Sequence, residues 1–212
     1  MVFLRPELTG HQVRLEPLEQ RHIAGLAEAS ADAGDLYRMT TVPTSEAAAA
    51  RYVALAEATR AAGTAAPFAV IRLADQTVIG STRLWDLQWW LWPEGHSRHG
   101  HEGPDTCEIG HTWLAPSAIG TGVNPEMKLL MLTFAFETWD VQSVCFHTDA
   151  RNERSNGALR RIGAQFEGIL RSHRLAADAQ PRDSARYSIT AAEWPAVSAR
   201  LEELISSRAA VS

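Results

Sequence analysis

Apolar residues recur along the chain at two spacings, one typical of strands and one typical of helices. Alternating or continuous apolar runs predict strands over residues 12–17, 67–73, 78–86, 106–114, 144–148, 165–174 and 186–190. Apolar positions three or four residues apart predict helices over residues 19–30, 45–62, 124–138 and 154–162, and a last helix that carries Val197, Leu201, Leu204 and Ile205. We expect the second and third strands to form one hairpin and the last two to form another. These elements predict an α/β fold.

The segment from Thr106 to Thr138 reads as a buried strand, a loop with two glycines and a long apolar helix. The strand part mixes β-branched, aromatic and small side chains, which is typical of a strand covered on both faces. Pro116 ends this strand. Gly120 and Gly122 in the loop allow backbone angles and close approaches that a side chain would prevent. We therefore take this segment as the functional centre of the chain.

The start of the predicted helix in this segment suits an anion. Asn124 is the expected N-cap, Pro125 fits the first helical position, and Glu126 lies beside the positive end of the helix dipole. A glycine loop that leads into a helix N-terminus directs several amide N–H groups at one place, which favours phosphate oxygens. The alternative is an ordinary strand-to-helix turn that contains glycine. The loop is not a Walker loop, because no GKS or GKT follows, and it is a poor dinucleotide fingerprint.

Composition narrows the function classes. The chain has 212 residues and a formal net charge of -5, so we expect no broad nucleic-acid surface, which needs clustered Lys and Arg. The segment after Met1 has no long apolar core and does not read as a signal peptide, and no run reaches membrane-spanning length. Cys107 and Cys145 fall in predicted strands and imply no disulfide framework. We expect one domain over residues 1–212 and a cytoplasmic location.

Three segments carry a family resemblance: EIGHTWL at 108–114, AIGTGVNPEMKLLML at 118–132 and NERSNGALRRIGAQFEG at 152–168. In this order they resemble the GCN5-related N-acetyltransferase (GNAT) superfamily, and within it the branch of the ribosomal-protein N-terminal acetyltransferases RimJ and RimL. The resemblance covers about Val13 to Ile205. It implies a mixed, mostly antiparallel twisted sheet with helices on both faces, a splayed central strand pair, and acetyl-CoA as co-substrate.

The resemblance also implies which residues hold acetyl-CoA: the loop and helix start for the pyrophosphate, the strand backbone for the thioester, and the later helix for pantetheine. The expected cofactor-binding residues are Trp113, Leu114, Ile119, Gly120, Thr121, Gly122, Val123, Asn124, Asn152 and Asn156. One position departs from the family pattern, because Ile119 stands where Gln or Arg is usual. Either an arginine among Arg151, Arg154, Arg160 and Arg161 replaces the lost phosphate contact, or the affinity for acetyl-CoA is weaker.

Acetyl transfer to an amine needs a deprotonated nucleophile, a polarised thioester carbonyl and a proton for the leaving thiolate. Glu108 is the candidate base, because partial burial raises a carboxylate pKa and because the resemblance places a Glu on this strand. The alternative is a structural carboxylate paired with an arginine. His111 is the reserve base. Ser155 is the candidate acid, since the resemblance places a hydroxyl beside the CoA sulfur, although Ser also suits a first helical turn.

Residues 87–105 form an insertion rich in Trp and His on the expected substrate side. Its tryptophans either pack the loop onto the domain, bury a dimer contact or form an apolar acceptor pocket. Its histidines lack the spacing of a closed metal site, and we expect no metal. These aromatic residues are Trp89, Trp90, Trp92, His96, His99 and His101. Between the first two helices, Tyr37 and Arg38 either touch the acceptor or cover the edge of the core.

We therefore expect an acetyl-CoA-dependent N-acetyltransferase that acts on a primary amine, in a protein N-terminus or a small molecule, by direct attack in a ternary complex. No cysteine stands where a covalent acyl intermediate would need one. Two rivals remain: a non-catalytic acyl-CoA-binding or sensing module, which Ile119 favours, and a metal-dependent hydrolase built on the histidines. The expected partner is the amine substrate, with no nucleic acid and no membrane, and the sequence is compatible with a homodimer.

Overall fold

The computed structural model describes residues 5–31 and 34–209, and its strands form one eight-stranded sheet. The sheet order is β1-β2-β3-β4-β5-β6-β8-β7. The strands are β1 (Leu8–Thr9), β2 (Val13–Pro17), β3 (Ala65–Arg72), β4 (Val78–Gln88), β5 (Thr106–Leu114), β6 (Ser143–Asp149), β7 (Gln165–Leu175) and β8 (Pro181–Thr190). Residues 1–4, the start of the segment judged not to be a signal peptide, lie outside the described part.

All neighbouring strands are antiparallel except β5 and β6, which confirms the expected mixed sheet. Both predicted hairpins are present, as β3–β4 and β7–β8. Strand β8 begins at Pro181, earlier than predicted, because its polar first residues pair with the exposed end of β7. Polar residues on an edge hairpin give no apolar alternation for the sequence to show.

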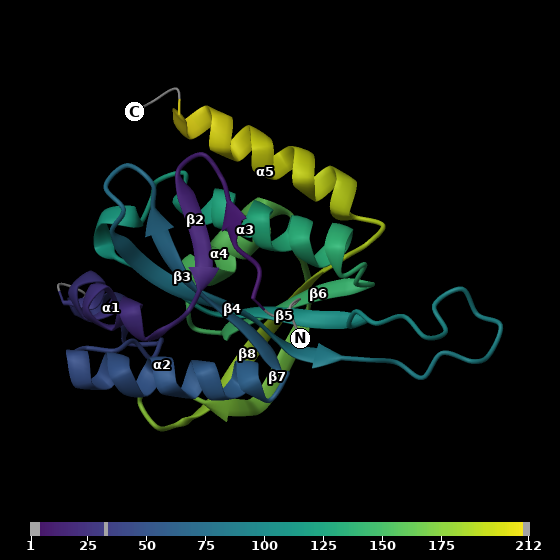
Figure 1. Ribbon diagram of the computed structural model, residues 1–212, viewed down its shortest axis with the longest axis horizontal. Helices are drawn as coiled ribbons and strands as arrows, with labels where there is room; N and C mark the ends of the chain where they lie inside the picture. The colour runs from purple at the N-terminus through teal and green to yellow at the C-terminus, as the bar shows by residue number, and fades with distance from the viewer. Residues whose placement is uncertain (1–4, 32–33, 210–212) are drawn as a thin grey trace.

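Helices cover both faces of the sheet, with α1 and α2 on one face and α3 and α5 on the other (Figure 1). The helices are α1 (Ile23–Ser30), α2 (Glu46–Ala61), α3 (Val123–Thr133), α4 (Glu153–Ile162) and α5 (Trp194–Ala209). Two apolar clusters fill the interior. The larger includes Met127 and Met131 of α3, and the smaller includes Val53 of α2 and Trp113 of β5.

Local signals fix several helix ends where the sequence predicted them. The Ser45 side chain accepts the Ala48 N–H at 3.2 Å and caps α2. Gly163 ends α4 with a φ of 96°, a left-handed conformation that glycine adopts without steric cost. Thr190 donates to the Glu193 carboxylate through both its backbone N–H and its hydroxyl, each at 2.8 Å, just before α5 begins.

The start and the end of α3 differ from the prediction. Gly122, rather than Asn124, is the N-cap, so Pro125 lies at the third helical position instead of the first. Proline is still tolerated there, because the first-turn N–H groups have no partner within the helix. The α-helix ends at Thr133 and continues as a π-helical turn over Phe134–Thr138. Helical periodicity alone does not distinguish these two backbone forms.

Glu126, near the start of α3, also accepts hydrogen bonds from the turn before β2. Its side chain is buried, and its carboxylate accepts the backbone N–H groups of His11 at 2.6 Å, Gln12 at 2.8 Å and Val13 at 3.2 Å. A Cβ on Gly10 would lie 2.7 Å from this carboxylate, so a glycine is needed in the turn before β2. This carboxylate therefore ties the start of α3 to the edge of the sheet.

Strands β5 and β6 separate in the middle of the sheet. Their parallel pairing runs only from Thr106↔Ser143 to Glu108↔Cys145. On its other side β5 carries one extra residue, because Ser81 pairs with Trp113 while Arg83 pairs with Gly110. Such a β-bulge bends its strand and increases the local twist. The expected splayed strand pair is thus present, with the bulge beside the point of separation.

We predict that Glu126→Gln lowers the free energy of unfolding by about 2 kcal/mol, because an ionised acceptor of three backbone N–H groups becomes a neutral amide with one oxygen. Urea unfolding of the variant and the wild type measures this difference. The exposed Glu203 of α5 provides the matched control, and Glu203→Gln should change the free energy little. Equal stability of both variants would contradict the structural role of Glu126.

Candidate active site

Polar side chains of β4, β5 and β6 gather where β5 leaves β6, on the sheet face that α2 covers. Arg83 of β4 lies over the Tyr52 ring of α2, with the guanidinium carbon 4.9 Å from the ring centroid. Side chains two residues apart on a strand share a face, so Trp85 lies on this face too. The Trp85 ring contacts the His111 imidazole edge-on, with centroids 4.6 Å apart. The face thus joins cations, aromatic rings and an imidazole.

Glu108 is at the centre of a buried ion-pair network. It accepts two hydrogen bonds from the Arg174 guanidinium, at 3.0 and 2.8 Å, and one from His147 Nδ1 at 2.8 Å. Burial raises the pKa of this carboxyl group, but the hydrogen bonds and charges of His147 and Arg174 outweigh it and lower the pKa to about 2. The expected net rise of the Glu108 pKa is therefore wrong, although burial by itself does raise it. The sequence could not show that Arg174, 66 residues away, would pair with it.

His111 occupies the bulge of β5 in a left-handed conformation, with a φ of 52°. His is one of the few residues other than glycine that is enriched in that region. More than a third of its surface is exposed, yet crowding by protein atoms and then the charge of Arg83 lower its pKa to about 4. The imidazole is therefore neutral at pH 7 and is able to accept a proton.

Lys128 is a buried cation that the sequence analysis did not select. It is the only lysine of the chain, and its ammonium bonds the Thr112 hydroxyl at 3.2 Å on the α3 side of the sheet. Thr112 in turn contacts the Thr82 hydroxyl at 2.7 Å. Burial lowers the Lys128 pKa to about 7. A lysine on the apolar face of a predicted helix was the signal that could have identified it.

The glycine loop before α3 has the shape expected of an anion cradle, although Ile119 supplies no cation to it. Gly120 has a φ of 79°, and the Thr121 hydroxyl closes the turn by donating to the Ala118 carbonyl at 2.7 Å. A Cβ on Gly122 would meet the Gln12 amide at 2.5 Å. Ile119 is 39% exposed, so its side chain points outward instead of covering the loop.

The arginines proposed to replace Ile119 are mostly occupied elsewhere. Arg151 pairs with Asp149 at 2.7 Å, and Arg154 donates to the Leu36 carbonyl at 3.2 Å. Arg160 lies over the Tyr187 ring at 5.9 Å. Anion binding by the glycine loop therefore stays a prediction that rests on the backbone of the loop. A hollow of about 470 Å³ adjoins the loop and is lined by residues that include His11, Gln12, Arg72, Ser117, Thr121 and Val123.

Asn152, Ser155 and Asn156 lie at the start of α4. The Asn152 side chain caps the helix by accepting the Ser155 N–H at 3.1 Å, and the half-buried Ser155 stands in the first turn. Asn156 is buried, and its amide donates to the Asn152 carbonyl at 2.8 Å and accepts the Tyr187 hydroxyl at 2.9 Å. We therefore assign Asn156 a structural part, while cofactor contacts of the other two stay predictions.

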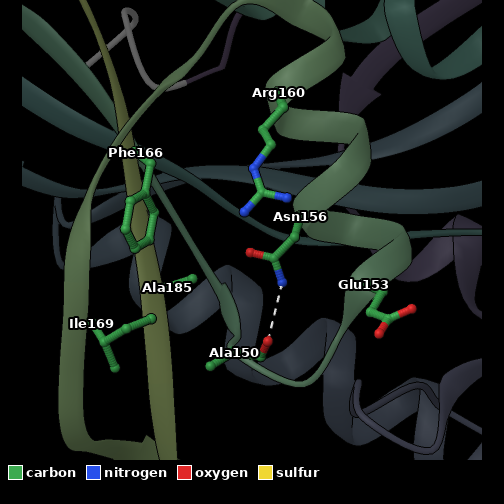
Figure 2. A pocket seen from close by; sticks show the side chains of 7 residues that line it. All are labelled: Ala150, Glu153, Asn156, Arg160, Phe166, Ile169 and Ala185. Carbon is green, nitrogen blue, oxygen red and sulfur yellow. Dashed lines mark hydrogen bonds between the residues drawn. The ribbon is translucent and has the colours of Figure 1, made fainter.

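A second hollow, of about 430 Å³, lies between α4 and the β7–β8 hairpin (Figure 2). Asn156 and Arg160 reach it from α4, opposite Phe166 of β7. Neither Asn152 nor Ser155 lines it. Of the three residues expected to act at this helix, Asn156 therefore lines the hollow and Asn152 and Ser155 do not.

Trp113 and Leu114 contact the protein interior with their side chains. Trp113 is 3% exposed and meets the Tyr37 ring edge-on at 6.1 Å. The Tyr37 hydroxyl donates to the Leu114 carbonyl. Tyr37 thus covers the edge of the core, whereas an acceptor contact of the exposed Arg38 stays a prediction. Because these side chains face the interior, a contact of Trp113 or Leu114 with the thioester would have to come from the backbone of β5.

The insertion is organised by Asp105 and projects away from the sheet (Figure 1). The buried Asp105 carboxylate accepts the Trp90 N–H at 2.7 Å, the Trp92 indole N–H at 2.7 Å and Arg98 Nε at 3.2 Å. Trp89 and Trp90 are each 46% exposed. Arg98 also donates to the Asp140 carboxylate and to the Asp140 carbonyl, each at 2.7 Å, so the loop is packed onto the domain around Arg98 and Asp105 while Trp89 and Trp90 stay partly exposed. An acceptor pocket receives no support from this arrangement, and a dimer contact stays a prediction.

The insertion's histidines each contact a tryptophan residue. His96 stacks on Trp92, while His99 and His101 donate to the carbonyls of Trp92 and Trp139. In the described part of the chain, the group of side chains close enough for a metal is Glu108, Cys145 and His147, with ligand atoms within 4.8 Å of one another.

Two observations assign this group to the ion-pair network. Arg174 occupies both carboxylate oxygens of Glu108. Burial and the charge of Glu108 raise the Cys145 pKa to about 12, so the thiol stays protonated.

We predict that the Glu108 ion pair makes stability depend on acidic pH. Its folded-state pKa, about 2, lies below the ordinary value of 4.5, so the pair stabilises the fold above pH 4.5 and this contribution is lost as the pH falls toward 2. Glu108→Gln should lower the free energy of unfolding by on the order of 3 kcal/mol near neutral pH. Urea unfolding at a series of pH values measures the difference between variant and wild type.

The surface pair of Glu167 and Arg186 supplies the control, because both side chains are more than 40% exposed. Glu167→Gln should cost little at any of these pH values. A cost for Glu108→Gln that does not shrink toward pH 2 would show that the Glu108 pKa is not depressed.

Comparisons with known proteins agree with this geometry. The family model of the acetyltransferase (GNAT) domain matches residues 12–165. No curated protein matches the chain. None of the described helices is long and apolar enough to cross a membrane.

Solved structures share the fold over most of the chain. A GCN5-related N-acetyltransferase from Brucella melitensis is 25% identical, with a TM-score of 0.77, over 94% of this chain and 85% of that one. A proposed acetyltransferase from T. thermophilus is 32% identical, with a TM-score of 0.73, over 93% and 95%. Mycobacterium smegmatis RimJ in complex with CoA-disulfide is 21% identical, with a TM-score of 0.72, over 92% and 90%. The chain therefore belongs to the GCN5-related N-acetyltransferase (GNAT) family and is an acetyl-CoA-dependent N-acyltransferase.

Proposed function

We propose that the chain transfers the acetyl group of acetyl-CoA to a primary amine by direct attack in a ternary complex. The observation that carries this proposal is the separation of β5 from β6 after Glu108↔Cys145, with the neutral His111 in the bulge beside it. A gap between two parallel strands leaves backbone groups unpaired, and such groups are able to hold an extended co-substrate. The family membership shown above supports the same chemistry.

Each step of the transfer has a candidate residue. The loop that leads into the N-terminus of α3 suits the diphosphate of CoA, because Val123 and Asn124 have the first N–H groups of the helix, although that of Val123 also donates to the Thr121 hydroxyl at 3.3 Å. Bound acetyl-CoA would supply the thioester that the amine attacks. His111 takes the proton of the amine, directly or through water, since it is neutral and partly exposed. The Ser155 hydroxyl, in the first turn of α4, donates a proton to the leaving thiolate.

Glu108 acts in this proposal by positioning its neighbours. A carboxyl group with a pKa of about 2 is a weak base, so the predicted base role passes to His111. Glu108 instead fixes the orientation of Arg174 and His147. Burial raises the pKa values of Cys107 and Cys145, which favours direct attack over a covalent acyl-cysteine.

The acceptor and the cellular setting belong to the same proposal. A peptide N-terminus is one acceptor class, suggested by the fold shared with RimJ and with ribosomal-protein acetyltransferases from two Vibrio species. One domain over residues 1–212, with the insertion as an appendage, fits the single described sheet. The free thiols of Cys107 and Cys145 suit a reducing cytoplasm. A homodimer through the exposed tryptophans is compatible with all of these.

A second candidate is a module that binds acyl-CoA without transferring the acyl group. The observation that favours it is the exposed Ile119, which removes one expected phosphate contact. This candidate predicts acetyl-CoA binding without thiol release for any amine.

We predict micromolar acetyl-CoA binding, measured by calorimetric titration, and CoA thiol release with one class of amine from a panel of peptides, amino acids, polyamines and aminoglycosides. Ile119→Arg, which adds a cation beside the loop, should tighten acetyl-CoA binding about 10-fold. Binding without release would favour the sensing module. Absence of binding by both proteins would contradict the diphosphate site.

We predict that His111→Asn lowers kcat by about 100-fold while the KM for acetyl-CoA changes little, because a general base is removed and the co-substrate site is left intact. Asn suits the left-handed conformation of the bulge, so the fold should be kept. Steady-state kinetics of the two proteins test this. Unchanged kcat would remove His111 from the mechanism, and Glu108→Gln would then be the next variant to assay.

A further inference from the structure

Arg83 is a buried arginine whose charge is not paired within the described part of the chain. Arg83 is 3% exposed, and its Nε atom has no hydrogen-bond partner among the described residues. Among the side chains that the structure describes, no carboxylate forms an ion pair with it and no acceptor bonds its guanidinium. Its guanidinium lies over the Tyr52 ring. Burying an unpaired charge is costly, so proteins normally pair such a group or use it for a ligand.

Two more buried donors on the same face lack an acceptor among the described residues. The indole Nε1 atoms of Trp85 and Trp113 are buried without a hydrogen-bond partner. Trp113 pairs with Ser81, and Ser81, Arg83 and Trp85 alternate along β4 on one face of the sheet. Guanidinium and indole groups are donors only. Because buried donors are normally satisfied, this row of three fits a ligand that brings several acceptor lone pairs.

The charge balance around Arg83 points to an anion. Arg174 is neutralised by Glu108, and Asp149, whose charge acts on Arg182, is bound by Arg151. Arg182 forms no ion pair with a described carboxylate, and its Nε donates to the Ser184 hydroxyl at 3.1 Å. After burial, which lowers the pKa of His111 most, the charges of Arg83, Arg174 and Arg182 lower it further, against the one carboxylate of Glu108. The cluster therefore has unpaired positive charge beside the candidate base.

The register of β4 and β5 places this charge next to the site of transfer. Arg83 pairs directly with Gly110, the residue before His111. Residues directly opposite on antiparallel strands have Cα atoms about 5 Å apart. A small ligand that contacts Arg83 is thus within reach of His111. In an α-amino acid a single carbon separates the amine from the carboxylate. Such a molecule is therefore short enough to place its carboxylate at Arg83 and its amine near His111.

We propose that Arg83 binds an anionic group of the acceptor, so that the acceptor is a small amine with a carboxylate or phosphate close to its nitrogen, as in an α-amino acid. The inference rests on the proposed acetyl transfer, and it names the substrate class. The guanidinium of Arg83 holds the anion with the indole N–H groups beside it, and the acceptor nitrogen then lies toward His111. A peptide N-terminus without a nearby anion is a poorer acceptor.

Matched pairs of amines test this substrate class. Each α-amino acid is compared with its decarboxylated amine, for example L-phenylalanine with phenethylamine, and O-phosphoethanolamine is compared with ethanolamine. We expect kcat/KM to be about 10- to 100-fold higher for the anionic member. The two kinds of pair show whether carboxylate or phosphate is preferred.

Arg83→Gln should reduce this preference to within a few-fold, and Arg83→Lys should keep part of it. The exposed Arg51 of α2 is the matched control, and Arg51→Gln should leave the preference unchanged. Thermal unfolding separates binding from structure. Because the substitution removes a buried, unpaired charge, Arg83→Gln should unfold at the same temperature as the wild type or higher. A lower unfolding temperature together with an unchanged preference would make Arg83 structural and overturn the proposal.

Binding of reaction products separates this inference from the proposed function. N-acetyl-L-phenylalanine and N-phenethylacetamide are titrated into the protein in the presence of CoA. Acetyl transfer to both members of each pair at similar rates would overturn the anion site and leave the transferase intact. If the protein binds the acetylated amino acid tightly, Arg83→Gln abolishes this binding, and no amine is turned over, the anion site is supported and acetyl transfer is refuted. If the protein shows no binding preference and turns over no amine, both the anion site and the proposed transfer are refuted.

Discussion

The buried contact between Glu108 and Arg174 holds the centre of the molecule together. Glu108 lies on β5 at the last residue that pairs with β6, His147 comes from β6, and Arg174 comes from β7. Three strands are therefore joined by one carboxylate at the place where the sheet opens. Breaking a buried ion pair leaves an uncompensated charge, which is more costly than losing a surface pair. The Glu108 ion pairs thus hold β5 and β6 together at one end of the opening. At the other end, the bulge at His111 bends β5.

The same contact sets the charges around the candidate base. Because Glu108 is used by Arg174 and His147, it does not neutralise Arg83. Burial and the remaining positive charge together keep His111 unprotonated near neutral pH, with its pKa at about 4. A neutral imidazole beside an unpaired guanidinium is able to accept a proton while the guanidinium holds an anion. These two groups are neighbours in the sheet, because His111 directly follows Gly110, the residue opposite Arg83.

Elements that depend on local pattern were predictable, and features that depend on distant partners were not. The strand from Thr106 to Leu114 and the two hairpins follow from apolar runs and short turns, and the structure confirms them. Glu108 was selected correctly as a buried carboxylate, but its low pKa depends on Arg174 from another strand pair. The N-cap of α3 moved to Gly122, because the buried Glu126 fixes the helix against the turn before β2. Arg83 carried no local signal, since an arginine in an apolar strand is usually taken to point outward.

The two faces of the central strands differ in how completely their polar groups are satisfied. On the α3 side, Thr82, Thr112 and Lys128 form a continuous hydrogen-bonded row. On the α2 side, the guanidinium Nε of Arg83 and the indole N–H of Trp85 remain unpaired within the described residues, although both are buried. Unpaired buried donors lower stability, so a folded protein retains them where they contribute to function. The proposed acceptor site accordingly lies on the α2 side, while the α3 side is the fully hydrogen-bonded support.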